Sequence, residues 1–265
     1  MGSGRRLWVL LANAFDPTLL HNQVAYGLGK AVGLASTPEC ETIDLHYDGE
    51  HRGTHLLSEK AEVGTGRVEI DGIENPSADP RDIGAHATAR GRNNYGHEHS
   101  CVTGVRQPGN TSGGYLPELD NARYYTERSW FKTSLGYLVP ESPEDASSDE
   151  VRYMSEKMQE AINNCGGSNA GAHWDVGSFA RVFLVEEFAK NPDFVRFSST
   201  HFYEEKDRGL IYSGPPWDFD TAFGMDNENR TYEDPRGLTS THSYPWLNSS
   251  DRVGNVGVRA NRPDW

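Results

Sequence analysis

Four oxygen-bearing side chains stand at the ends of predicted elements in the second half of the chain. Asn191 and Asp193 follow an apolar helical pattern, and Asp218 and Asp220 follow a predicted hairpin. If these elements meet, the carboxylates could bind Mg²⁺ and orient an attacking hydroxyl, as phosphoryl transfer requires. On that interpretation Asp218 is the metal ligand and Asp193 is the base or orienting residue. From spacing alone, ordinary turn residues remain the favoured interpretation, because Asp and Asn are common in turns.

The elements nearer the start of the chain are predicted to be a helix, a hairpin and a strand. Asp16-Pro17-Thr18 is a typical helix start, apolar residues then recur at helical spacing up to Val32, and Gly33 ends the pattern. Residues 42–47 and 54–59 alternate apolar and polar around Asp48-Gly49, which predicts a β-hairpin. Residues 115–120 are predicted to form a returning strand.

Two more helices and a second hairpin are predicted before the Asp218 region. Residues 147–164 have apolar side chains at helical spacing. Residues 175–189 predict a buried helix with a broad apolar face that includes Phe188. Residues 200–203 and 209–212 predict a hairpin. Because helices and hairpins mix without a regular βαβ alternation, the predicted class is α+β.

Composition limits the possible architecture and partners. A length of 265 residues permits one large domain or two closely packed lobes, and we expect one globular unit. Residues 71–112 lack periodicity and predict an exposed, irregular insertion, and the chain after Gly224 is predicted to be coil. A net charge of −14 argues against a nucleic-acid partner. The apolar stretch at residues 7–14 is too short for a membrane span.

Other chemistries find less support in the sequence. Cys40, Cys101 and Cys165 match no metal-ligand spacing, and one disulfide with an odd thiol and three unreactive thiols remain alternatives. No G-x-S-x-G motif of a serine hydrolase occurs. A glycosidase could use Asp193 with Asp218 or Glu187 as paired carboxylates, but that reaction does not explain the motifs described next.

Five segments of the chain, in the same order, are similar to motifs of one known family. They are LLANAFDPTLLHN at residues 10–22, GEHRGTHLLSE at 49–59, GYLPELD at 114–120, VEEFAKNPD at 185–193 and GPPWDFDTAFG at 214–224. With these motifs the sequence resembles the spore-coat protein H (CotH) family of atypical protein kinases. Five ordered matches are more specific than any single one.

The resemblance implies an atypical protein-kinase-like fold and phosphate transfer from ATP, with Mg²⁺, to Ser or Thr of a secreted, spore-coat or surface protein. Asp193 matches the family's catalytic-loop aspartate, and Asp218 matches its metal-binding aspartate. Asp220 is expected as a further metal ligand. Residues expected to contact or position the nucleotide are Glu59, Lys60, Glu118 and Asn191. We also expect a single CotH-like domain over residues 1–265, shortened at both ends relative to its relatives.

A catalytically silent scaffold or binding module at a cell, spore or cellulosome surface is the alternative hypothesis. His21-Asn22 stands where the family usually has Arg-Asn, so a phosphate-binding cation is missing there. Lys132, Lys190 and Arg67 are possible substitutes, although a surface position is favoured for each. The two hypotheses differ in one measurable property, because only an enzyme needs Mg²⁺-dependent nucleotide binding.

Overall fold

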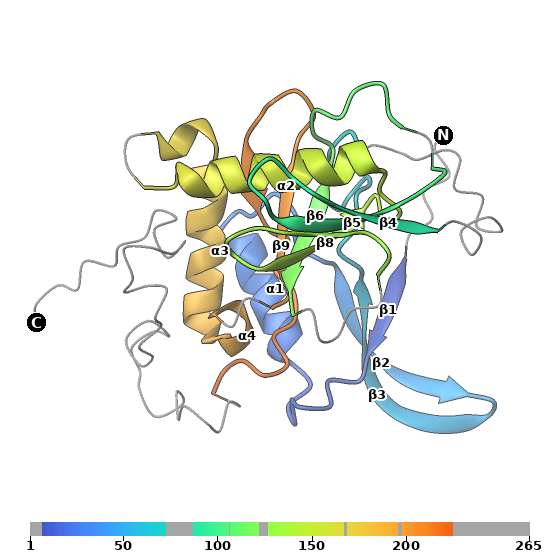
Figure 1. Ribbon diagram of the computed structural model, residues 1–265. Coiled ribbons are helices and arrows are strands. Elements are labelled where there is room, and N and C mark those ends of the chain that lie inside the picture. Colours follow the sequence, from blue (N-terminus) through green and yellow to red (C-terminus); the bar gives the residue numbers. More distant parts are fainter. Residues whose placement is uncertain are drawn as a thin grey trace, which may run out of the picture. The chain divides into compact units, whose positions relative to one another are not determined.

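Helices and strands both contribute to the fold, as the computed structural model shows (Figure 1). The structure describes residues 7–72, 87–105, 107–121, 127–166, 169–195 and 198–224. These residues divide into two compact units, and each unit is assembled from separate stretches of chain. The first unit takes residues 7–70, 177–195, 198–201 and 213–224, and the second takes the others. The α+β class is confirmed. That residues 1–265 act as a single kinase-like domain stays a prediction.

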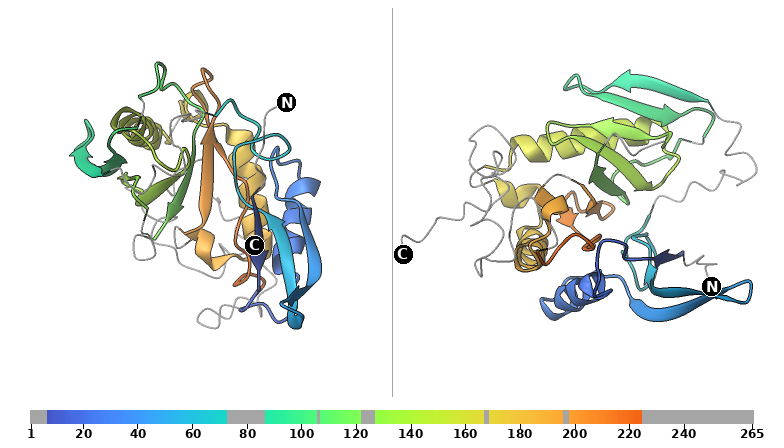
Figure 2. Two further views of the ribbon diagram at one scale, coloured as in Figure 1. Left: turned by 90° about the vertical axis from the view of Figure 1, so that its right-hand side faces the viewer. Right: turned by 90° about the horizontal axis from the view of Figure 1, so that it is seen from below.

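A three-stranded antiparallel sheet in the order β1-β3-β2 belongs to the first unit. Its strands are β1 (Trp8–Leu11), β2 (Cys40–Tyr47) and β3 (Glu50–Glu59). The predicted hairpin is confirmed, since Tyr47 pairs with Glu50, and Asp48 and Gly49 have φ of 52° and 79°, as a tight two-residue turn requires. Because β1 pairs only with residues 56–59 of β3, the hairpin tip extends beyond it (Figure 2).

The helices of the first unit pack around a small apolar core. They are α1 (His21–Ala31), α3 (Val176–Ala189) and the single turn α4 (Pro192–Val195), and Figure 1 shows α1 and α3 side by side. The core consists of Ala25 and Tyr26 of α1, Val185 and Ala189 of α3, and Phe219 and Ala222 of the loop after β10. This core fixes that loop against both helices.

Capping contacts explain where α1 begins and ends. The Asp16 carboxylate accepts hydrogen bonds from the backbone N–H groups of Thr18 and His21, each at 2.8 Å. Gly33 takes a φ of 78° just past the helix end, a conformation that glycine adopts without strain. The helix predicted after Asp16 is therefore confirmed, although its first turn begins at His21.

The apolar face predicted for α3 is only partly correct. Phe188 is 65% exposed, whereas the buried residues are Ser178, Val182, Val185, Glu186 and Ala189. Those positions form one stripe at helical spacing, and Phe188 lies outside it. The apolar residues of this helix are therefore more numerous than the core requires.

A seven-stranded sheet in the order β10-β9-β6-β8-β7-β5-β4 is built mainly from the second unit. Its strands are β4 (Thr88–Arg92), β5 (Glu98–Val102), β6 (Leu116–Asp120), β7 (Trp130–Lys132), β8 (Tyr137–Ser142), β9 (Thr200–Glu204) and β10 (Ile211–Ser213). The predicted strand at 115–120 and the predicted hairpin of β9 and β10 are confirmed. The chain passes between the units within β9 and β10.

The prediction that residues 71–112 form an irregular insertion is wrong for residues 88–102. Strands β4 and β5 lie in this range, and β5 pairs with both β4 and β7. Strand β4, at the sheet edge, is mostly exposed and carries Arg90 and Arg92, so it shows no apolar alternation. Residues 73–86 and 106 of this range, and the coil predicted after Gly224, lie outside the described residues.

Helix α2 (Ser148–Asn163) packs against β5 and β7 in the second unit (Figures 1 and 2). Its predicted start is confirmed by a capping box, in which Ser147 and Glu150 bond each other's backbone N–H groups. A short 3₁₀ turn, η1 (Ala170–Ala172), precedes α3.

Cys40, Cys101 and Cys165 are free thiols. Among the described residues, no helix combines the length and the apolar character that a membrane crossing requires.

Candidate active site

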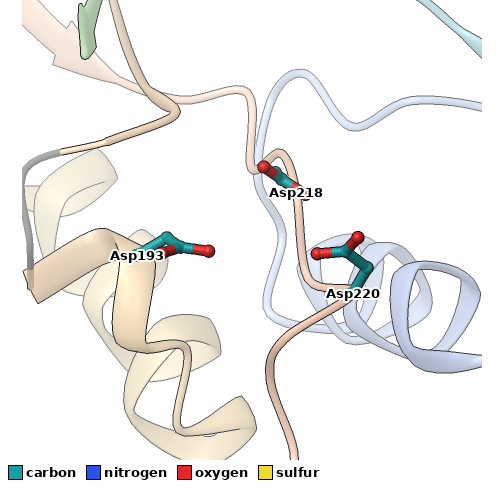
Figure 3. Close-up of side chains that lie close together, drawn as sticks. All are labelled: Asp193, Asp218 and Asp220. Atoms are coloured by element: carbon teal, nitrogen blue, oxygen red, sulfur yellow. The ribbon is translucent and has the colours of Figure 1, made fainter. Parts of the chain in front are cut away.

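Three carboxylates converge in the first unit (Figure 3). Asp193 projects from α4, and Asp218 and Asp220 project from the loop that follows β10. One oxygen of each carboxylate lies within 4.8 Å of the others, and all three side chains are partly buried. The structure thus brings together the three aspartates that the sequence singled out, and their chemical roles stay predictions.

Asn191 links the segments that carry the three carboxylates. Its Nδ2 donates to the backbone oxygen of Asp218 at 3.0 Å, and its Oδ1 accepts from the backbone N–H of Asp193 at 3.2 Å. The side chain also donates to Glu186, and the residue is only 2% exposed. Asn191 therefore positions both loops, and its predicted contact with a nucleotide remains untested.

Asn22, in the first turn of α1, fixes the same loop from the other side. Its Oδ1 accepts a hydrogen bond from the backbone N–H of Phe219 at 2.8 Å. Its Nδ2 donates to Oδ1 of Asn13 at 3.1 Å, and Asn13 Nδ2 donates to the Leu19 carbonyl at 3.3 Å. The side-chain amides of Asn13 and Asn22 thus connect the segment before α1 to Phe219, which lies between Asp218 and Asp220.

Two hydroxyl groups bond directly to the carboxylates. Ser199 Oγ donates to Asp218 Oδ2 at 3.1 Å. Thr221 Oγ1 donates to Asp193 Oδ2 at 2.8 Å. One hydroxyl is therefore bonded to the expected metal ligand and the other to the expected catalytic aspartate.

Left-handed backbone conformations concentrate around this site. Asp218 has a φ of 63° and Phe223 a φ of 53°, values that residues with a β-carbon rarely adopt. Asn13, Leu19, Lys190 and Ser199, in other loops of the first unit, share this conformation. Such conformations persist where surrounding contacts enforce them, and they are common at functional sites.

The three carboxylates repel each other, and their partial burial removes part of their hydration. Burial, followed by the charges of Asp220 and Asp193, raises the pKa of Asp218 to about 7. Burial likewise raises the pKa of Asp220 above its ordinary value. A divalent cation between these oxygens would relieve both the repulsion and the loss of hydration, and Mg²⁺ prefers such ligands. The site therefore fits a hard cation.

Glu186, in the last turn of α3, adds a fourth acidic group. It is 4% exposed, and its Oε2 has no hydrogen-bond partner. Burial, together with the nearby charges of Asp193 and Asp218, raises its pKa well above the ordinary value. An unpartnered buried carboxyl oxygen beside the trio is a second, independent sign that a ligand or its water belongs there.

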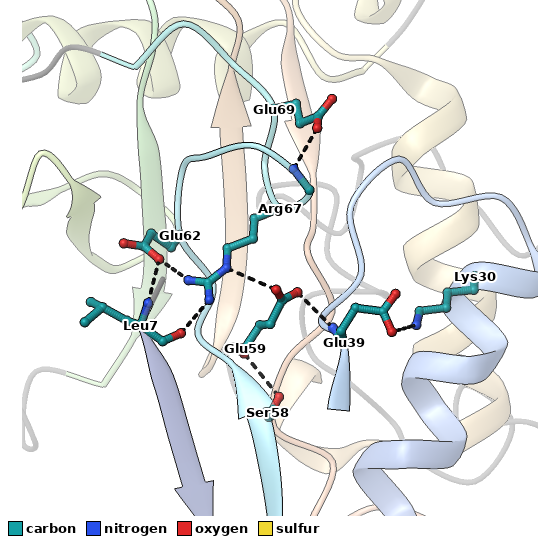
Figure 4. Close-up of polar contacts among 9 residues, drawn as sticks. Leu7, Lys30, Glu39, Ser58, Glu59, Glu62, Arg67 and Glu69 are labelled. Atoms are coloured by element: carbon teal, nitrogen blue, oxygen red, sulfur yellow. Dashed lines mark hydrogen bonds and ion pairs between the residues drawn. The ribbon is translucent and has the colours of Figure 1, made fainter. Parts of the chain in front are cut away.

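A small pocket in the same unit is lined by two of the four residues expected to contact a nucleotide, Glu59 and Lys60. Its walls include Thr37, Glu59, Lys60, Arg67 and Pro215. The Arg67 side chain is only 4% exposed and forms ion pairs with Glu59, at 3.4 Å, and with Glu62 (Figure 4). The surface position favoured for Arg67 is therefore wrong, because these carboxylates satisfy its charge inside the protein.

The other predicted nucleotide contacts differ in their surroundings. Glu59 is buried, where it pairs with Arg67 and accepts a hydrogen bond from the backbone N–H of Glu39 at 3.1 Å. Lys60 lines the same pocket. Glu118 lies in β6 opposite Val139 and belongs to the second unit. The expected role of each in nucleotide binding stays a prediction.

A protein-family model described as CotH kinase protein matches residues 1–252 of the chain. The chain belongs to the CotH kinase family. The resemblance noted in the sequence is thereby confirmed. CotH membership suggests a kinase or a related protein, and it suggests ATP and a divalent metal as ligands. The family is linked with the spore coat. No curated protein matches the chain in sequence.

Several residues of the CotH site were not identified by sequence reasoning. Asn22 and Glu186 lie within the quoted motifs, and Thr221 follows Asp220 directly, but none was assigned a role. Their contacts join residues far apart in the sequence, as Asn22 and Phe219 do. Their position in the motifs could have indicated a role in the site. Which residues they contact can be seen only in the folded structure.

Proposed function

We propose that this CotH-family chain is a protein kinase that transfers the γ-phosphoryl group of ATP, with Mg²⁺, to a serine or threonine of a secreted, spore-coat or surface protein. The observation that carries the proposal is the convergence of Asp193, Asp218 and Asp220 within 4.8 Å. Glu186, with its unpartnered buried oxygen beside them, supports the presence of a ligand.

The three aspartates are assigned different roles because their surroundings differ. Asp218 and Asp220 belong to one loop, and their raised pKa values indicate a strong benefit from a nearby cation. They would hold Mg²⁺, which supplies charge neutralisation for the phosphate oxygens. Asp193 comes from a different element, so it can face an acceptor hydroxyl and receive its proton.

The pocket beside β3 is the proposed position for part of the nucleotide. Lys60 lies in its wall, and the buried hydroxyl of Thr37 has no hydrogen-bond partner. Glu59 positions Arg67 through their ion pair, which agrees with a supporting role for this carboxylate. Pro215, which lines the pocket, also belongs to the segment that leads from β10 to Asp218.

Calorimetric titration with ATP, with and without Mg²⁺, tests the metal and nucleotide site without knowledge of the acceptor protein. We expect saturable binding that requires Mg²⁺, and Asp218→Asn should weaken it by about tenfold or more, since one charge-assisted metal contact is lost. Asp48→Asn is the matched control, because Asp48 lies at the exposed hairpin tip and Asn tolerates its left-handed backbone.

Phosphate transfer to a serine-rich acceptor protein tests the role of Asp193. Asp193→Asn should bind Mg-ATP as the wild type does but transfer phosphate about 10²–10⁴-fold more slowly, which is the usual contribution of a positioned base. If the folded wild-type chain binds no nucleotide, the kinase proposal is wrong and the silent scaffold replaces it.

A further inference from the structure

We propose that Thr221 is a self-phosphorylation site, which accepts the γ-phosphoryl group of ATP bound to its own chain. The proposal rests on the kinase function proposed above. It starts from one contact, the 2.8 Å hydrogen bond from Thr221 Oγ1 to Asp193 Oδ2. This is the contact that an orienting aspartate must make with an acceptor hydroxyl, for which about 2.6–3.2 Å is required.

The direction of this hydrogen bond suits a nucleophile. Thr221 donates its proton to the carboxylate, so the lone pairs of Oγ1 remain free to attack. The side chain is partly exposed, whereas its neighbour Ala222 is fully buried. Thr221 is therefore not sealed within the core, as an acceptor of a phosphoryl group must not be.

The position of Thr221 next to Asp220 brings its hydroxyl close to the proposed metal ligands. Asp193 Oδ2 accepts from Thr221, and a carboxylate oxygen of Asp193 lies within 4.8 Å of oxygens of Asp218 and Asp220. A γ-phosphate neutralised by a cation on those two aspartates would lie near Thr221. The chain thus places an acceptor, an orienting base and the metal ligands in one loop system.

Backbone contacts hold the Thr221 loop in this arrangement. Phe219 N–H donates to Asn22, Ala222 N–H donates to the Phe219 carbonyl at 3.1 Å, and Phe223 N–H donates to the Ala189 carbonyl at 2.6 Å. Contacts on both sides of Thr221 therefore restrict its movement. An acceptor that is already positioned needs no binding step of its own.

Ser199 offers an internal comparison. Its hydroxyl donates to Asp218, the proposed metal ligand, at 3.1 Å. A carboxylate that holds Mg²⁺ is less able to take a proton than one that does not. We therefore assign the phosphate to Thr221, whose hydroxyl donates to Asp193.

The reaction balances with ATP as the only co-reactant. Thr221 Oγ1 forms a bond to the γ-phosphorus, and the bond from that phosphorus to the β,γ-bridging oxygen breaks. The electron pair leaves with ADP, and the hydroxyl proton passes to Asp193 and then to solvent. The product is phosphothreonine, whose charge of about −2 stands beside the three carboxylates and should limit the reaction to one phosphate per chain.

The experiment is incubation of the purified chain with Mg-ATP, followed by peptide mass analysis and calorimetric titration with Mg-ATP. We expect phosphate at position 221 in the wild type and in Thr221→Ser. We expect none at this position in Thr221→Val or Asp193→Asn. Thr221→Val should still bind Mg-ATP with unchanged affinity, which shows that the variant is folded and that only the acceptor is lost.

A dilution series completes the test. Because the acceptor and the base belong to one chain, the fraction phosphorylated at a given time should not change over a hundredfold dilution. A rate that rises with protein concentration would overturn transfer within one chain. Mg-ATP binding without phosphate at Thr221 would overturn the inference and leave the kinase proposal intact. Absence of Mg-ATP binding would overturn the kinase proposal and the inference that rests on it.

Discussion

Asn22 is one of the buried amides that fix the loops of the candidate site. Its side chain is 2% exposed and connects Asn13, which precedes α1, to the backbone of Phe219 between the two proposed metal ligands. Both of its polar atoms are used, so no substitution preserves every contact. The geometry of Asp218 and Asp220 therefore depends on a residue of a different element.

Asn22→Ala should destabilise the protein and weaken Mg-ATP binding together. The substitution leaves the buried N–H of Phe219 without an acceptor, which costs about 1–3 kcal/mol. Chemical denaturation measures the free energy of unfolding, and calorimetry measures the binding. Asn22→Asp should retain more stability, because a carboxylate oxygen can still accept from Phe219.

Gln23→Ala in the same helix serves as the control for Asn22→Ala. Gln23 is exposed, and its side chain accepts only a 3.3 Å hydrogen bond from Thr42. We expect its effect to stay within about 0.5 kcal/mol, as for most surface substitutions. Equal losses of stability in the two variants would refute a special role for Asn22.

Sequence reasoning located the acidic residues of the site more successfully than their supports. Spacing alone favoured ordinary turn residues for Asp193, Asp218 and Asp220, and the ordered family motifs indicated that they belong to a site, where the structure brings them together. Thr221 and Asn22 were not singled out, because a threonine in a turn or an asparagine in a helix has many ordinary uses. Only the fold shows that their side chains reach Asp193 and Phe219.

Helix α2 shows, at the scale of an element, how a terminal contact fixes a predicted boundary. Ser147 Oγ accepts from the backbone N–H of Glu150 at 3.4 Å, and Glu150 Oε2 accepts from the N–H of Ser147 at 2.8 Å. Both residues have no exposed surface, so water cannot replace these partners. The capping box therefore stabilises the helix more than an exposed cap would.

Ser147→Ala should lower the free energy of unfolding by about 1–2 kcal/mol, the usual cost of losing a helix cap. Thermal denaturation followed by circular dichroism measures the effect. Ser148→Ala is the matched control, because the Ser148 hydroxyl only accepts a 3.3 Å hydrogen bond from Gln107. If the control loses as much stability as Ser147→Ala, the cap is not the cause.

The elements that the sequence predicted have clear turn residues and apolar alternation, and the elements that were missed lack them. The β2–β3 hairpin was predictable because Asp48-Gly49 defines the turn and the flanking residues alternate. Strands β4 and β5 were missed because β4 is exposed and carries arginines, while β5 contains Glu98 and His99 among small residues. Strand β5 also pairs with β7, which comes later in the sequence, and that contact cannot be seen in a local pattern.

At the scale of the whole molecule, local patterns could not reveal the division into two units. Each unit combines segments from both halves of the chain, and the chain passes from one unit to the other within β9 and β10. Contacts such as that of Asn22 with Phe219 join positions that are 197 residues apart. Periodicity describes single elements and carries no information about which elements share a core.

Buried ionisable groups make the stability of the whole protein depend on pH in two opposite ways. Burial raises the pKa of Glu186 and of Glu204, so their contributions to stability are largest in acid and decline as pH rises. Burial, followed by the charge of Lys60, lowers the pKa of His201 to about 3. The histidine therefore contributes stability above about pH 6.5, its ordinary pKa, and loses it as pH falls.

His201→Gln isolates the contribution of the histidine. Between about pH 6 and pH 4, the unfolded wild-type chain binds a proton at His201 that the folded chain excludes, so wild-type stability gains an acid-side slope of about 1.4 kcal/mol per pH unit. The variant lacks this slope, and denaturation at a series of pH values should show the difference. His46→Gln should leave the slope unchanged, because His46 is exposed in β2. Parallel stability curves for the wild type and His201→Gln would mean that His201 becomes protonated in the folded protein, which its burial at 3% exposure opposes.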